Sequence, residues 1–267
     1  MTKNLFICPV CNDVLFKDEK SYKCPNNHSF DISKYGYVNL LSANSGGIHG
    51  DNREMISARR DFLDTGLYSP LKDGVVKLTE KYYTGGEYLD CGCGEGYYTS
   101  YIKKVITSDI YGIDISKDAL RFASKKIPDG KFAVASCYDL PFKDDCFSLM
   151  TLLFSPLAAN EFKRVLKKNG IMIMAIPGEY HLYGLKTLLY KTPYKNEVMS
   201  YSLDGFEFLE AVNVDYTLDL DKENAEKLFK MTPYYYRTPK EGKERLLASD
   251  RITTDISFRI LCYRVIK

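Results

Sequence analysis

The stretch LDCGCGEGYYT, residues 89–99, decides the fold, because a short apolar run turns there through three glycines into a helical pattern. Gly92, Gly94 and Gly96 allow the backbone to turn sharply and to approach a ligand closely. Their spacing is GxGxG, which differs from the GxGxxG of dinucleotide-binding enzymes. The stretch predicts a ligand-binding loop between a strand and a helix. An ordinary glycine turn in a nucleotide-free α/β protein is the alternative.

Two acidic residues narrow the choice of ligand. Asp90 lies at the entrance of the loop, and Asp114 ends the next predicted strand, where a carboxylate can accept hydrogen bonds from ribose hydroxyls. Acids at both places suit a neutral ribose joined to a cationic group better than a pyrophosphate. S-adenosylmethionine meets both requirements. Ser136 ends the third strand, where many such enzymes carry an acid for the adenine amine, and we expect it to act through its hydroxyl or backbone.

The chain around the loop alternates between strand and helix patterns. Predicted strands cover residues 87–91, 109–115, 131–136, 147–154, 171–176 and 252–266. Predicted helices cover residues 69–83, 97–104, 117–126 and 159–168, with Ser69 and Ser116 as N-caps and Gly170 as a helix stop. This alternation predicts an α/β fold, in which a Rossmann-like parallel sheet is covered on both faces.

The first thirty residues carry a metal-binding pattern. Cys8-Pro-Val-Cys11 is followed after twelve residues by Cys24-Pro-Asn-Asn-His28. Three thiolates and one imidazole satisfy the tetrahedral demand of zinc, with iron as the alternative, and four filled positions indicate a structural site. Residues 44–52 are rich in Gly, Ser and Asp and have the chemistry of a linker. We therefore predict a zinc-binding module over residues 1–42 and a second domain over residues 53–267.

Composition excludes several classes of protein. The 267 residues carry 37 basic and 35 acidic side chains, a net charge of +2, so nucleic-acid contacts must come from a local basic face. With 45% hydrophobic and 27% charged residues, wholesale disorder is excluded. No apolar run is long enough to span a bilayer and no signal peptide is visible, so we expect a cytoplasmic protein without membrane contact.

Further residues each allow two interpretations. Phe154-Ser155-Pro156 ends the fourth strand, at the edge where open α/β sheets place substrates, or forms an ordinary turn. Lys163, Arg164, Lys167 and Lys168 could contact RNA or form a solvated helix face, whereas Lys186, Lys191 and Lys195 are better placed, near the expected cleft, and Arg59 and Arg60 could follow phosphates. The cluster Tyr234–Arg237 could stack a base or pack a lid.

These motifs together resemble the bacterial 23S ribosomal RNA (guanine-N1) methyltransferase family of the RlmA type. The resemblance runs through CPVC…KCPNNHSFDISKYGYVNLL, SARRDFLDTGLYSPL, LDCGCGEGYYT, DISKDAL, ASCYDLPF, PGEYHLYGLK and MTPYYYR, in the family's order. It implies a seven-stranded methyltransferase sheet with an antiparallel last strand, a zinc module that helps grip a ribosomal RNA hairpin, and a homodimer. It also implies metal ligands and cofactor contacts at particular positions, which are Cys8, Cys11, Cys24 and His28 for zinc and Tyr68, Gly94, Glu95 and His181 for S-adenosylmethionine.

The implied reaction constrains the substrate. Guanine N1 lies on the Watson–Crick edge, so the base must be unpaired or flipped into the cleft. We expect Phe154, Ser155 and Pro156 to position it, and no residue is assigned to remove the N1 proton. Two rival functions are a small-molecule methyltransferase of the same fold and a non-catalytic, zinc-bearing RNA-binding protein.

Overall fold

The structure is a computed structural model that describes residues 4–42 and 50–267; most of the predicted linker, residues 44–52, lies outside them. Its strands are β1 (Phe16–Asp18), β2 (Ser21–Lys23), β3 (Ser29–Asp31), β4 (Tyr37–Asn39), β5 (Tyr88–Cys91), β6 (Ile110–Asp114), β7 (Lys131–Val134), β8 (Phe147–Leu153), β9 (Leu166–Pro177), β10 (Phe206–Asp221) and β11 (Arg251–Val265). Its helices are α1 (Arg53–Leu63), α2 (Ser69–Tyr82), α3 (Tyr97–Ile102), α4 (Lys117–Lys126), α5 (Ala159–Val165), α6 (Tyr183–Leu189), α7 (Lys222–Lys230), α8 (Tyr234–Arg237) and α9 (Lys240–Ala248).

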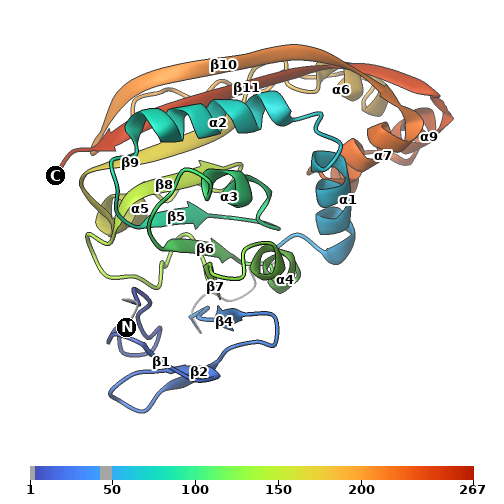
Figure 1. The fold of residues 1–267 in the computed structure, drawn as a ribbon. Helices are drawn as coiled ribbons and strands as arrows, with labels where there is room; N and C mark the ends of the chain where they lie inside the picture. The colour runs from blue at the N-terminus through green and yellow to red at the C-terminus, as the bar shows by residue number, and fades with distance from the viewer. Residues whose placement is uncertain (1–3, 43–49) are drawn as a thin grey trace.

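A single large sheet forms the centre of the molecule (Figure 1). Its strand order is β10-β11-β9-β8-β5-β6-β7-β4, and β1, β2 and β3 form a separate small antiparallel sheet. The pairs from β4 to β9 are parallel, whereas β11 runs antiparallel to both β9 and β10. This order confirms the predicted Rossmann-like methyltransferase sheet with an antiparallel last strand. The eighth strand, β4, belongs to the predicted zinc-binding module, residues 1–42, and pairs with β7 at the edge of the sheet.

The two faces of the sheet have separate cores. Ile171 and Ile173 of β9 face a core that includes residues of α2, α6 and α7, while Met172 and Met174 face a second core that includes α5. The first thirty residues pack into this second core. The Phe6 ring stacks on Phe142 at 5.3 Å and contacts Tyr111 at 5.4 Å. No helix lies between β7 and β8, so this aromatic contact covers the sheet where a crossover helix would otherwise lie.

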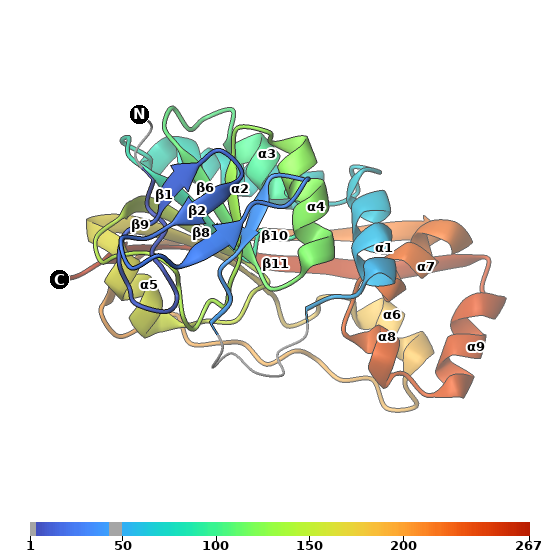
Figure 2. The same cartoon turned by 90° about the horizontal axis from the view of Figure 1, so that it is seen from below.

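A group of helices lies at one end of the large sheet, with α6 and α7 against β10 and β11 (Figure 2). Figure 2 shows α1, α6, α7, α8 and α9 together at this end, with α1 packed on α7 and α6 on α9. Ser116 caps α4 as predicted, its side chain accepting a 3.3 Å hydrogen bond from the Ala119 amide. In α2 the N-cap is Tyr68, one residue before the predicted Ser69. In the described part of the chain, no helix is long and apolar enough to cross a membrane.

The structure differs from the predicted elements where α5 meets β9 and at β10. The helix predicted over residues 159–168 ends at Val165, because Leu166 already pairs with Phe147 and begins β9. Strand pairing therefore overrides the helical pattern that we expected Gly170 to stop. The strand β10 was not predicted at all. From Val214 to Asp221 its buried residues alternate with exposed ones that include three aspartates, which is the pattern of a strand with one solvated face.

Candidate cofactor and metal sites

The loop after β5 turns through glycines in the left-handed region. Gly92, Gly94 and Gly96 have φ angles of +82°, +54° and +79°, which other residues rarely adopt. The Gly92 and Cys93 amides both donate to the carbonyl of Ile113, at 2.9 Å each. A side chain on Gly92 would collide with Ser155, whereas the space beside Gly94 is open. The backbone at Gly94 is therefore not covered by neighbouring side chains.

Asp90 holds this loop from inside the protein. Its carboxylate accepts hydrogen bonds from the hydroxyls of Thr99, at 2.5 Å, and Thr151, at 2.9 Å. Burial raises the pKa of Asp90 to about 6, and the two threonine bonds oppose that shift. Asp90 is not among the residues that line the pocket described below. The contacts give it a positioning role, and its predicted contact with the cofactor stays a prediction.

Asp114 joins the loop to the end of β6. One carboxylate oxygen accepts from the Gly94 amide at 2.9 Å and the other from the Ser116 amide at 2.7 Å. Burial raises the pKa of Asp114, while these two backbone bonds lower it. Each carboxylate oxygen has a further lone pair. Asp114 can therefore accept hydrogen bonds from a ligand as well.

A pocket opens at the carboxyl edge of the sheet beside Asp114. It brings together five of the predicted site residues with five that we did not predict. The full lining is Gly92, Ile113, Asp114, Ile115, Ala135, Ser136, Cys137, Tyr138, Ser155 and Pro156. The sequence signal for Tyr138 was its place two residues after Ser136. Its ring is 58% exposed, and its amide donates to the Ser136 hydroxyl at 3.2 Å.

Glu95 belongs to the glycine loop but is not among the residues that line the pocket. Its side chain is buried, which raises its pKa, and the nearby Arg59 charge lowers it. Arg59 itself is tied to Asp51 at 2.5 Å and to the Met231 carbonyl at 3.4 Å. Arg59 is therefore engaged by the protein, contrary to the expectation that it is free to follow phosphates. We had no sequence signal for its pairing with these residues.

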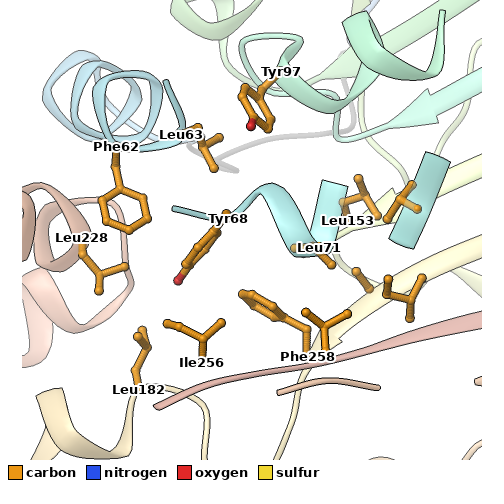
Figure 3. Close-up of a cluster of buried hydrophobic side chains, with 14 of the residues drawn as sticks. Phe62, Leu63, Tyr68, Leu71, Tyr97, Leu153, Leu182, Leu228, Ile256 and Phe258 are labelled. Carbon is orange, nitrogen blue, oxygen red and sulfur yellow. The ribbon is translucent and has the colours of Figure 1, made fainter. Parts of the chain in front are cut away.

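Tyr68 and His181 lie together in a buried aromatic cluster. Figure 3 shows Tyr68 between Phe62 and Phe258, with ring centroids 5.0 Å from each. The His181 ring lies 4.3 Å from Phe258, and its Nδ1 accepts from the Ser257 amide at 3.3 Å. Burial lowers the pKa of His181 to about 3, with the Lys186 charge a smaller cause. Neither Tyr68 nor His181 lines the pocket, so their predicted cofactor contacts stay predictions.

Phe154 connects this cluster to the edge of the pocket. It follows β8 with a φ of +61°, an uncommon conformation for a residue with a side chain. Its ring is 48% exposed and lies 5.3 Å from the Phe258 ring. The next two residues, Ser155 and Pro156, line the pocket. A strained turn that presents an exposed ring at this edge is suited to holding a flat substrate.

The four predicted metal ligands come together in space. The ligand atoms of Cys8, Cys11, Cys24 and His28 all lie within 4.8 Å of one another. Cys11 Sγ is 3.7 Å from Cys24 Sγ, and His28 Nδ1 is 3.3 Å from Cys24 Sγ. A tetrahedral zinc site with bonds of about 2.3 Å places its ligands roughly 3.7 Å apart. The donor set and its spacing therefore fit zinc.

Each pair of ligands lies on a tight turn. Asn12, directly after Cys11, and Asn27, directly before His28, have φ angles of +59° and +62°, which asparagine tolerates better than most residues. The Asn12 amide donates to the Cys8 carbonyl at 2.8 Å, and the Asn27 amide donates to the Cys24 carbonyl at 3.1 Å. These turns direct both side chains of each pair inwards.

Comparisons with known proteins agree with this geometry. A family model described as the N-terminal zinc ribbon of RlmA matches residues 6–45, and one described as a methyltransferase domain matches residues 89–174. The chain is 32% identical over 276 residues to Bacillus subtilis (strain 168) YxjB, which is named as a 23S rRNA (guanine-N(1)-)-methyltransferase, with 96% of each chain covered. This chain belongs to that methyltransferase family.

A further relative and two solved structures are also similar to this chain. A protein of Streptomyces fradiae named 23S rRNA (guanine(748)-N(1))-methyltransferase is 27% identical over 267 residues, with 95% of each chain covered. Among solved structures, Bacillus subtilis YcgJ matches 73% of this chain and 98% of its own with a TM-score of 0.52 at 16% identity. A type II methyltransferase of Anaeromyxobacter dehalogenans matches 72% and 96% with a TM-score of 0.53, also at 16% identity. These two structures support the fold alone.

The residues of this methyltransferase fit its cofactors, S-adenosylmethionine and zinc. Asp114 opens onto the pocket with free acceptor capacity, and the backbone at Gly94 is unobstructed. The Tyr68 hydroxyl is buried without a hydrogen-bond partner among the described residues. The thiolate and imidazole set fits zinc for the reasons given above.

Two of the lysines expected near the cleft are engaged within the methyltransferase. Lys186 is fully buried, and its Nζ donates to Asn196 Oδ1 at 2.6 Å and to the Tyr194 carbonyl at 3.1 Å. Burial lowers its pKa to about 8. Lys195 pairs with Glu179 at 2.9 Å. Lys186 therefore anchors the segment that follows α6, and our interpretation of it as a phosphate contact was wrong.

The tyrosine cluster also has a structural explanation. The Asn52 side chain donates to the Tyr236 hydroxyl at 2.5 Å, and the Tyr235 hydroxyl lies 3.4 Å from Glu54. Tyr234 lies against Lys186, whose Nζ is 5.4 Å from the ring centroid. Of the two interpretations, these contacts favour packing over base stacking, because α8 is tied to the start of α1.

Proposed function

We propose that this protein transfers a methyl group from S-adenosylmethionine to N1 of a guanine in 23S ribosomal RNA. The supporting observation is that one chain packs a four-ligand zinc cluster against the sheet whose carboxyl edge holds the pocket. A small-molecule methyltransferase needs the pocket but has no use for an attached zinc module of this size. Similarity across 96% of a relative named for the RNA reaction favours the same activity here.

Within this proposal, the residues that line the pocket bind the cofactor. Asp114 accepts hydrogen bonds from the ribose hydroxyls, and Ser136 contacts the adenine edge. Gly92, Gly94 and Gly96, with Glu95 between the last two, bring the loop close to the nucleoside, and Asp90 fixes the loop through Thr99. Tyr68 and His181 complete the methionine end. When bound, S-adenosylmethionine supplies an electrophilic methyl group on a sulfonium.

The substrate base is positioned on the other side of the pocket. Phe154 offers its exposed ring to the guanine, and Ser155 and Pro156 form the wall beside it. Methyl transfer needs mainly the alignment of the nucleophile with the methyl group. Since N1 lies on the pairing edge, the guanine enters from a hairpin loop or after flipping from its stack. Asp114 is the only carboxylate among the described residues that line the pocket, and both its oxygens accept amides, so we assign no base.

We also propose that two copies act together in the cytoplasm, where ribosomal RNA is found. The zinc modules of a homodimer would flank a cleft for the RNA hairpin. Light scattering coupled to size-exclusion chromatography tests this arrangement. A monomer at the concentrations that support methylation would contradict the homodimer without affecting the proposed reaction.

Primer extension on 23S ribosomal RNA tests the reaction. Unmodified RNA incubated with the protein and S-adenosylmethionine should acquire one new stop, because N1 methylation blocks base pairing. Omission of either component should abolish the stop. Activity on free guanine-like or quinone substrates without a stop on the RNA would favour the small-molecule enzyme. A calorimetric titration without S-adenosylmethionine binding would favour the non-catalytic RNA-binding protein.

A further inference from the structure

Basic side chains from two distant parts of the sequence meet beside α4. Lys117, Arg121 and Lys125 are spaced four residues apart on α4 and therefore share one face of the helix. The turn between β3 and β4 contributes Lys34 and Tyr35. We call these five residues the junction patch, because β4 lies against α4. Figure 2 shows part of the first forty residues, in blue, reaching α4.

The Tyr35 ring organises the junction patch. The Arg121 guanidinium lies 4.5 Å from the ring centroid, and the Lys34 and Lys125 ammonium groups lie at 5.3 Å and 5.5 Å. Cations at these distances are attracted by the ring's quadrupole. A side chain on Gly36, which has a φ of +105°, would reach within 3.6 Å of Ser124, so the turn lies close against the helix. The patch is therefore built jointly by the zinc-binding stretch and the methyltransferase domain.

The charges of the junction patch are poorly neutralised by the protein. Lys34, Lys117 and Lys125 are exposed and make no salt bridge among residues 4–42 and 50–267. Arg121 pairs with Asp118 at 3.3 Å. By contrast, Lys131 and Lys167 pair with acids at 2.7 Å and 2.8 Å. Unpaired like charges held together repel one another and suit a polyanion.

The junction patch is adjacent to the pocket. The helix α4 starts directly after Asp114 and Ser116, and Asp114 lines the pocket. On the other side, β4 pairs with β7, and the chain after β7 leads to Ser136 and Tyr138 in the lining. An extended polyanion that follows α4 would therefore arrive at the pocket.

We propose that the junction patch binds the phosphodiester backbone of the RNA strand that leads to the target guanine. Lys34, Lys117 and Lys125 contact successive phosphates, while Tyr35 orients Arg121 so that its guanidinium presents paired donors to one phosphate. This surface would hold the register of the RNA on the enzyme and would carry no base specificity. The inference rests on the proposed function, because it names the surface by which the same RNA is held.

The test replaces the three exposed lysines and leaves the Tyr35–Arg121 contact intact. The triple variant Lys34→Gln, Lys117→Gln, Lys125→Gln is compared with a matched variant, Lys77→Gln, Lys222→Gln, Lys240→Gln, which removes the same charge at other exposed lysines. Binding of unmodified 23S ribosomal RNA is measured over a series of salt concentrations. Zinc content and S-adenosylmethionine affinity, measured on both variants, report on folding.

We expect the slope of log affinity against log salt to fall by about 2–3 in the junction variant, since each lost phosphate contact removes about 0.7–0.9. The matched variant should keep the wild-type slope. An unchanged slope in the junction variant, or an equal fall in both variants, would overturn the inference while wild-type methylation still supports the proposed function. If wild-type protein places no methyl group on the RNA, the proposed function itself is wrong.

Discussion

The Gly94 amide donates a 2.9 Å hydrogen bond to the Asp114 carboxylate, so the glycine loop after β5 and the end of β6 are held together at the pocket. The same carboxylate also accepts from the Ser116 amide, at the N-cap of α4. One side chain thus fixes the loop and the start of a helix, and presents its remaining acceptor capacity to a ligand. The loop is therefore shaped before the ligand arrives.

Replacement of Asp114 should weaken cofactor binding more than it weakens the fold. Asp114→Asn removes a charge and leaves one acceptor oxygen for two amides and a ligand. Loss of a charge-assisted hydrogen bond costs about 1.5–3 kcal/mol, so we expect the Kd for S-adenosylmethionine to rise roughly 10–150-fold. Isothermal calorimetry measures this change. The control Asp64→Asn, at an exposed position at the end of α1, should leave the Kd unchanged. Equal affinities for both variants would contradict the role of Asp114.

Removal of the metal should destabilise more than the zinc-binding turns. Phe6 lies two residues before Cys8 and packs on Phe142 and Tyr111 in the core, so loss of order around Cys8 should expose part of that core. In a chain of this size each kcal/mol lost lowers Tm by about 2–4 °C. A strong chelator, or Cys8→Ser, should lower Tm and abolish the binding of one zinc per chain. Cys262→Ala, at a buried thiol outside the cluster, should keep the zinc. Full zinc content in Cys8→Ser would rule out that ligand.

Phe154 should matter for the RNA step and not for the cofactor. We expect Phe154→Ala to lower kcat/KM on 23S ribosomal RNA by roughly 10–100-fold, because a misplaced base loses its alignment with the methyl group. The Kd for S-adenosylmethionine should stay as in the wild type. Phe208→Ala removes a ring of similar exposure from β10 and is the control. Unchanged turnover in Phe154→Ala would remove this residue from the site.

Burial of His181 should make the fold sensitive to acid. The folded protein keeps the pKa of this imidazole at about 3, whereas the ordinary value is 6.5. Between these values the unfolded chain binds the extra proton, so the free energy of unfolding falls as the pH drops below about 6.5. For a fully neutral imidazole, this difference amounts to about 2 kcal/mol at about pH 5.

The variant His181→Gln isolates this contribution. Its free energy of unfolding in urea should fall less than that of the wild type between about pH 7.5 and about pH 5. Zinc ligands are the same in both proteins, so acid release of the metal cancels in the comparison. Glutamine also retains an acceptor for the Ser257 amide. An identical fall in both proteins would show that His181 takes up its proton without cost in the folded state.

Much of the fold could be predicted because its signals are local. The glycine loop, the cap at Ser116 and the buried strands depend on a few neighbouring residues. The end of α5 could not be predicted, because it is set by the pairing of Leu166 with Phe147, which lies nineteen positions earlier in the chain. By contrast, β10 was missed although its alternation of apolar and charged residues towards Asp221 is a local period-two signal, typical of a strand with one solvated face.

The candidate site divides in the same way. Asp114 and the four metal ligands were predictable from spacing along the chain, and the structure brings them to one pocket and one cluster. The burial of Lys186 could not be predicted. It depends on the meeting of α6, the segment with Tyr194 and Asn196, and Tyr234 of α8 around one ammonium group. Long-range packing of this kind leaves no mark in local sequence.

The pairing of β4 with β7 also sets an order of events during synthesis of the chain. The residues that bind zinc leave the ribosome first and can take up metal at once. Their strand β4, however, must wait for β7, which begins only at Lys131. Until then Val38 and Leu40, which are buried in the finished protein, have no sheet to cover them. The nascent amino-terminal segment should therefore be a client for chaperones over this interval.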